Sequence, residues 1–225
     1  MRINKHLLTL TIAIVLSACD SDSIAIIKEP VTFDEQRTTL SLQYLKERYG
    51  IDTDQINIDP KMIVIHYTAI PTLEGTINAF QASTLPSSRV AITSASRLNV
   101  SSQFVVDRNG SIYQILPDET TFARHVIGLN YAAIGVENVG DDDTHPLTAA
   151  QLKANIQLIR YLKGKYQGIE YLIGHQEHNL FRGHDLWKET DPDYRVEKVD
   201  PGVQFLDAIR RRVEDLNLKG PPKDQ

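Results

Sequence analysis

Short apolar segments alternate along this chain with longer segments of helical periodicity, and this alternation restricts the fold more than any other feature. Five segments of six or seven residues are rich in β-branched or aromatic side chains, and they lie at 62–67, 102–107, 111–116, 133–139 and 170–175. That length and composition predict strands. Asn109 and Gly110, between the second and third segments, are a strong hairpin signal. An antiparallel hairpin inside an alternating chain predicts an α/β fold with a central mixed sheet flanked by helices.

Four segments have the pattern of amphipathic helices, and they lie at 34–50, 72–83, 148–168 and 202–216. The third is the clearest. Thr148 and Gln151 form a capping box at its start, and Gly168 follows its end. Its apolar face consists of Leu152, Ile156, Ile159 and Leu162.

The N-terminal residues have the features of a secretory signal peptide. Arg2 and Lys5 precede an apolar run at 7–16. That run is too short to span a bilayer, because a membrane helix needs about 20 residues. The sequence LSAC at 16–19 resembles the bacterial lipobox, in which the signal is cleaved before the cysteine and the new N-terminus is lipidated. An ordinary signal peptide with an incidental cysteine is the alternative.

These features predict the domain organisation and the location. We expect a signal peptide at 1–18, a lipidated Cys19 with a short tether at 19–33, one folded domain at 34–219 and a tail at 220–225. The anchored protein then faces the periplasm, and Asp20 slightly favours the inner membrane. Removal of the signal peptide takes away two basic residues and no acidic one, which changes the formal charge from −5 to −7. A mildly acidic chain lacks the net positive charge that general binding to nucleic acid requires.

The cysteine count limits the chemistry of any metal site. Cys19 is the only cysteine in the chain. An intramolecular disulfide is therefore excluded, and lipidation of Cys19 would leave no thiolate as a metal ligand. A metal site must then be built from histidine, aspartate and glutamate.

Three polar residues occupy comparable places in three of the predicted strands. His66 and His175 stand near the ends of apolar segments, and Glu137 lies in a segment whose neighbours are apolar or small. Each alone has a simpler explanation: a buried histidine with hydrogen bonds, or a glutamate paired with Arg124 or Lys198. Together they favour a catalytic metal, because a hydrolytic zinc site needs three protein ligands and one position for water.

The sequence KVDPG at 198–202 offers the third ligand. Asp200 is a carboxylate next to a turn that leads into the last predicted helix. Lys198 lies two residues earlier and would point to the same side of an extended segment. Asp191, in a second Asp-Pro pair, is the reserve ligand.

Five segments occur in the order found in zinc-dependent N-acetylmuramoyl-L-alanine amidases. They are MIVIHYTA, FVVDRNGSIYQILPDETTFARHV, IGVENVG, LIGHQEH and KVDPG. The chain resembles the type 2 family, which is related to peptidoglycan recognition proteins and phage lysozyme-like amidases, over roughly residues 58–213. The resemblance implies a mixed sheet and a zinc amidase domain that cleaves the amide between N-acetylmuramic acid and L-alanine in peptidoglycan or muropeptides.

The resemblance also implies the roles of particular residues. By position, His66, His175 and Asp200 match the ligands of one zinc ion per chain. Glu137 matches the catalytic glutamate, and Lys198 matches the lysine two residues before the last ligand.

Several residues near these motifs have open roles. His125 matches a position near the active-site rim and is a candidate for substrate contact or for packing. His178 is expected to be solvated or substrate-facing rather than a ligand. The long connection at 176–199 is either a solvated insertion or a wall of the substrate cleft, with Trp187 and Arg195 as candidate contacts.

Two other functions remain open at this stage. A non-catalytic peptidoglycan-binding lipoprotein would share the fold, although such relatives often lack a complete ligand set. A zinc peptidase is disfavoured because no H-E-x-x-H motif is present.

Overall fold

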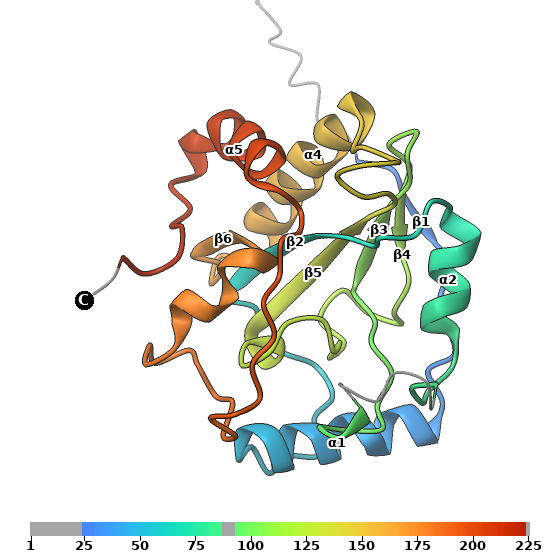
Figure 1. The fold of residues 1–225 in the computed structure, drawn as a ribbon, viewed down its shortest axis with the longest axis vertical. Helices are drawn as coiled ribbons and strands as arrows, with labels where there is room; N and C mark the ends of the chain where they lie inside the picture. Colours follow the sequence, from blue (N-terminus) through green and yellow to red (C-terminus); the bar gives the residue numbers. More distant parts are fainter. Residues whose placement is uncertain (1–23, 87–92, 224–225) are drawn as a thin grey trace, which may run out of the picture.

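A mixed sheet of six strands forms the centre of the molecule (Figure 1). The computed structural model describes residues 24–86 and 93–223. Its strands are β1 (Ile26–Lys28), β2 (Met62–Tyr67), β3 (Phe104–Val106), β4 (Ile112–Gln114), β5 (Ala133–Asn138) and β6 (Tyr171–Gly174). Their order in the sheet is β1-β4-β3-β5-β2-β6, and only the β3–β4 pair is antiparallel. The predicted fold class is therefore confirmed, including the hairpin at Asn109 and Gly110.

Helices cover both faces of the sheet. The helices are α1 (Glu35–Tyr49), α2 (Leu73–Gln81), α4 (Ala149–Lys165) and α5 (Val203–Arg212), and the 3₁₀ segments are η1 (Asn130–Ala132), η2 (His175–Phe181) and η3 (Glu214–Leu216). Apolar residues of α4 and α5 form one core with β2, β3 and β5. Phe80 of α2 packs in a second core with Val105 of β3. Each of the four predicted helices corresponds to one of these helices.

The central strands divide their side chains between these two faces. Ile63 and Ile65 of β2 point into the core beneath α4 and α5. Met62 and Val64 pack on the opposite face, with Phe181 of η2. Because side chains alternate along a strand, His66 lies on this second face as well. The register pairs His66 with Glu137 of β5, so both side chains emerge on the same side of the sheet.

The ends of the longer helices follow the chemistry predicted from the sequence. The Thr148 side chain accepts a hydrogen bond from the Gln151 backbone amide, and Oε1 of Gln151 accepts one from the Thr148 backbone amide. At α1, Asp34 caps the first turn and Gly50 ends the helix in the left-handed conformation. These caps satisfy backbone groups that the first and last turns leave free.

The part of the expected tether that the structure describes is packed on the folded domain. Ile26–Lys28 forms the edge strand β1, which pairs in parallel with β4. Beyond it, Val31 is buried and its amide donates to the carbonyl of Ile115. The folded unit therefore begins before residue 34, because this segment completes one edge of the sheet.

The predicted signal peptide and Cys19 lie outside the described residues. None of the helices at 24–86 and 93–223 combines the length and apolar character that a membrane span requires.

Candidate metal centre and catalytic cleft

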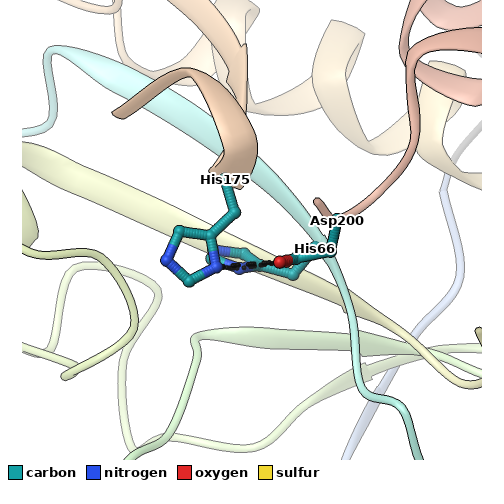
Figure 2. A group of neighbouring side chains, drawn as sticks. All are labelled: His66, His175 and Asp200. Carbon is teal, nitrogen blue, oxygen red and sulfur yellow. Dashed lines mark hydrogen bonds and ion pairs between the residues drawn. The ribbon is translucent and has the colours of Figure 1, made fainter. Parts of the chain in front are cut away.

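Three side chains from distant parts of the chain converge at one point on the sheet (Figure 2). His66 comes from β2, His175 is the first residue of η2, and Asp200 precedes α5. The Nδ1 atoms of the two histidines are 2.9 Å apart, and each lies 3.1 Å from Oδ2 of Asp200. All three residues are buried. The sequence-predicted ligands are thus brought together by the fold.

The local backbone explains how Asp200 reaches the histidines. Gly174 ends β6 directly before His175, and a Cβ atom there would lie 2.8 Å from Cδ of Pro201. The absence of a side chain at Gly174 lets the Asp-Pro segment lie against the strand end. The Gln176 amide then donates to the carbonyl of Asp200 at 2.9 Å. The peptide bond between Asp200 and Pro201 is cis.

This group fits a divalent cation such as zinc. The three ligand atoms lie within 4.8 Å of one another. In a tetrahedral site with metal–ligand distances of about 2.0–2.2 Å, ligand atoms are roughly 3.3–3.6 Å apart. The observed triangle of 2.9–3.1 Å is close to that spacing. Two imidazoles and one carboxylate are also the donor set of known hydrolytic zinc sites.

Burial and mutual contact set the charges of the ligands. Burial lowers the pKa of His175 to about 3, and the neighbouring His66 adds to this effect. For Asp200, burial acts to raise the pKa, but the close contacts of its carboxylate with the rings of His175 and His66 outweigh it and hold the pKa well below its usual range. A neutral imidazole and an ionised carboxylate are the forms that bind a metal.

Glu137 has the position and the surroundings of a proton-transferring residue. Its Oε2 atom is buried and has no hydrogen-bond partner among the residues that the structure describes. Burial raises the pKa of Glu137 to about 7, against a lowering effect of His66. The alternative ion pair of Glu137 with Arg124 or Lys198 does not form. Arg124 instead donates to the carbonyl of Leu98 and to the hydroxyl of Tyr194.

Lys198 lines the same cleft as Glu137 and the three candidate ligands. It makes no hydrogen bond or ion pair within residues 24–86 and 93–223. Its ammonium group is therefore available to a ligand, and the positive charge acts to lower the pKa of both Glu137 and His175.

The cleft above these residues is large enough for a sizeable ligand. Its volume is about 580 Å³, within the range typical of ligand sites. One part of its lining is apolar, and it consists of Ile70, Ala79, Phe80, Pro86, Val100 and Val199. A smaller side pocket, lined in part by Arg124 and Tyr194, shares His125, His175 and Lys198 with the cleft. The sequence did not predict this apolar wall, because its members come from α2 and from several separate loops.

His125 is held by contacts inside the protein. Its Nδ1 atom lies 3.0 Å from Nε2 of His66, and its Nε2 atom lies 3.2 Å from the carbonyl oxygen of Ala133. Both ring nitrogens are therefore engaged, although His125 also lines the cleft. Of the two roles left open for His125, these contacts correspond to packing rather than to hydrogen bonding with substrate.

His178 is fully buried, so the expectation of a solvated or substrate-facing side chain is wrong. Its Nδ1–H donates to the carbonyl of His175 at 2.7 Å. Its ring stacks on Trp187, which also packs closely against Gly128. Trp187 is not among the cleft-lining residues in the described part of the chain. The 3₁₀ turns of η2 draw His178 inward, which a strand ending at His175 would not do.

The rest of the long connection packs mainly on α1. Glu189 is buried and forms an ion pair with Arg48 at 2.7 Å. Asp191, the reserve ligand, lies 3.5 Å from the same guanidinium group and is not part of the metal group. Arg195 is exposed, and its Nε donates to the carbonyl of Pro192. Within the described residues, Arg195 lines neither the cleft nor the side pocket. Its neighbours Tyr194 and Val196 line the side pocket, and Glu197 lines the cleft.

Known structures share this fold. N-acetylmuramoyl-L-alanine amidase LysC from Clostridium intestinale URNW is 20% identical, with a TM-score of 0.55, and the alignment covers 88% of this chain and 100% of that chain. The endolysin amidase LysCS from the same organism is 20% identical, with a TM-score of 0.54 and coverage of 87% and 97%. Peptidoglycan recognition protein-LE, solved in complex with tracheal cytotoxin, is 18% identical, with a TM-score of 0.50 and coverage of 83% and 93%. At these identities the likeness concerns the fold alone.

No curated protein matches the chain. The sequence profile of N-acetylmuramoyl-L-alanine amidases, however, matches residues 56–202, which is well over half of the chain. The matched segment contains all five residues assigned to metal binding and catalysis. The chain therefore belongs to the N-acetylmuramoyl-L-alanine amidase family.

Proposed function

We propose that this protein hydrolyses the amide bond between N-acetylmuramic acid and L-alanine in peptidoglycan or muropeptides, with one zinc ion per chain. The convergence of His66, His175 and Asp200 is the observation that carries this proposal. Glu137 and Lys198 border the same cleft, so the complete set expected of an enzyme is present. A protein that only binds the cell wall has no need of a buried ligand group.

The three ligands would hold the zinc ion at the floor of the cleft. When bound, zinc supplies Lewis acidity, which makes a water molecule more acidic and an amide carbonyl more electrophilic. Asp200 is ionised and His175 is neutral, so neither ligand has to lose a proton from its side chain before binding.

Glu137 and Lys198 perform the remaining steps. The Glu137 carboxylate accepts a proton from the attacking water and then delivers it to the nitrogen of the leaving L-alanine. Its unpartnered Oε2 atom is free to form the hydrogen bonds that these transfers require. The Lys198 ammonium group stabilises the negative charge that develops on the carbonyl oxygen. Loss of such a group typically reduces turnover by about 10²–10³-fold.

Digestion of purified muropeptides tests this function. The wild-type protein, with zinc and with a chelator, is incubated with the substrate, and the products are identified by mass spectrometry. We expect release of intact stem peptide with zinc only, and far less from the Glu137→Gln variant, which keeps the shape of the side chain. Cleavage inside the stem peptide would instead indicate a peptidase, and binding without cleavage a recognition protein.

We also propose that the protein is exported and anchored through lipid on Cys19. This proposal rests on the LSAC sequence and on the apolar run before it. The wild-type protein should incorporate a labelled fatty acid, and a Cys19→Ser variant should not. Equal labelling of the variant would contradict a lipid anchor at this position.

A further inference from the structure

A chain of two hydrogen bonds connects His66 to the backbone of β5 through His125. Nε2 of His66 lies 3.0 Å from Nδ1 of His125, and Nε2 of His125 lies 3.2 Å from the carbonyl oxygen of Ala133. The two rings meet edge to face, with centroids 5.1 Å apart. These hydrogen bonds begin at Nε2 of His66, on the side of the ring opposite to the candidate metal centre.

The carbonyl at one end fixes the direction of both hydrogen bonds. A carbonyl oxygen can only accept, so Nε2 of His125 must carry a hydrogen. No carboxylate contacts the ring within the described residues, and a neutral imidazole has one N–H group. Nδ1 of His125 is therefore an acceptor, and the partner that donates to it is the Nε2–H group of His66.

The consequence falls on the other nitrogen of His66. When His66 is neutral and its hydrogen is on Nε2, Nδ1 has a free lone pair. That atom is the one 2.9 Å from Nδ1 of His175 and 3.1 Å from Oδ2 of Asp200. We propose that His125 is a positioning residue that fixes the tautomer of His66, so that the Nδ1 lone pair faces the cation. This proposal rests on the metal centre proposed above.

The surroundings of His125 hold its ring in the required place. A Cβ atom at Gly135 of β5 would lie 2.8 Å from Nδ1 of His125, so the ring lies directly against backbone that has no side chain. The amide of His125 donates to Oδ1 of Asn130 at 2.8 Å, and Asn130 in turn donates to the hydroxyl of Tyr49. These contacts fix the backbone and the ring plane, and they leave the two nitrogens for His66 and Ala133.

The first test uses the metal-free wild-type protein, in which long-range ¹H–¹⁵N NMR spectra distinguish the two tautomers of each histidine. At mildly alkaline pH we expect His66 and His125 both to carry hydrogen on Nε2. A His66 ring with its hydrogen on Nδ1 would overturn the proposal. This measurement needs neither a variant nor enzymatic activity, so it is independent of the proposed amidase function.

The second test compares His125→Phe with a control, His184→Phe. Phenylalanine keeps a ring at position 125 but removes the acceptor, so we expect both tautomers of His66 in the NMR spectrum. Zinc affinity, measured by competition with a chromophoric chelator, should fall by about 10–100-fold, the usual effect of losing such a partner. His184 contacts Tyr171 and Leu186, away from the metal centre, and its variant should keep the wild-type tautomer and affinity.

A purely structural role for His125 would change stability without changing the tautomer. If His125→Phe keeps hydrogen on Nε2 of His66 and binds zinc as tightly as the wild type, the proposal is wrong. If the tautomer and affinity change as expected but wild-type protein cleaves no muropeptide, the proposed function fails and the role of His125 stands.

Discussion

Glu137 is the residue whose chemistry depends most on its surroundings. Burial raises its pKa to about 7, compared with 4.5 for an ordinary glutamate. The positively charged groups in the cleft act in the opposite direction, and a bound divalent cation would add to them. The carboxylate that can accept a proton is present above the pKa and disappears as the pH falls through it.

This argument predicts the acid limb of the pH–activity profile. With zinc present, kcat/KM on a muropeptide should fall as the pH decreases through a value below 7, because the cation lowers the pKa of Glu137 from its metal-free value. The residual activity of Glu137→Gln should lack this limb. An identical limb in the variant would show that another group is responsible.

Asp200 and Asp191 provide a second test at the scale of single residues. Asp200 completes the metal group, whereas Asp191 lies against Arg48. Asp200→Ala should lose nearly all bound zinc in elemental analysis, because two histidines alone make an incomplete site. Asp191→Ala should retain about one zinc ion per chain. Circular dichroism controls for folding, and the opposite result would make Asp191 the ligand.

At the scale of elements, the end of β6 brings two of the ligands together. A Cβ atom at Gly174 would lie 2.8 Å from Cδ of Pro201 and 3.0 Å from Cδ2 of Leu206. Gly174→Ala should therefore displace the segment that carries Asp200. We expect a loss of about 1–3 kcal/mol in the free energy of unfolding, together with weaker zinc binding.

Gly164 offers a matched control for this prediction. It lies in α4 and would accept a Cβ atom without any contact within 4 Å. Gly164→Ala should stabilise the protein by about 0.5–1 kcal/mol and leave zinc affinity unchanged, because alanine is the better helix former. Both are measured by urea unfolding and chelator competition. Equal effects of the two variants on zinc affinity would contradict the assigned role of Gly174.

The extent to which the sequence predicts these elements depends on how local their signals are. The strand β2 and the capping box of α4 are determined by neighbouring residues, and both form as expected. The two nitrogens of His125 meet His66 and Ala133, and the first of these contacts joins residues 59 positions apart. No periodicity or spacing reports such a contact. The buried position of His178 was missed for a related reason, because the 3₁₀ turns of η2 carry no distinctive pattern.

At the scale of the whole molecule, the sheet extends further toward the N-terminus than the sequence indicated. A strand of only three residues, β1, is too short to have a clear alternation of apolar and polar side chains. Its place is determined by pairing with β4, which lies more than 80 residues further along the chain. Long-range pairing of this kind is visible in the folded molecule and not in a local window.

The contribution of this edge to stability can be measured with two point variants in the full chain. Val31 is 3% exposed and packs with Phe80, Ile115 and Leu116, whereas Ile27 in β1 is 44% exposed. Val31→Ala should lower the free energy of unfolding by about 2 kcal/mol, since it removes two buried methyl groups and leaves a cavity. Ile27→Ala should cost no more than about 0.5 kcal/mol. If Val31→Ala were equally harmless in urea unfolding, residues 26–31 would not belong to the cooperative unit. The fold would then begin at α1, as the sequence alone had indicated.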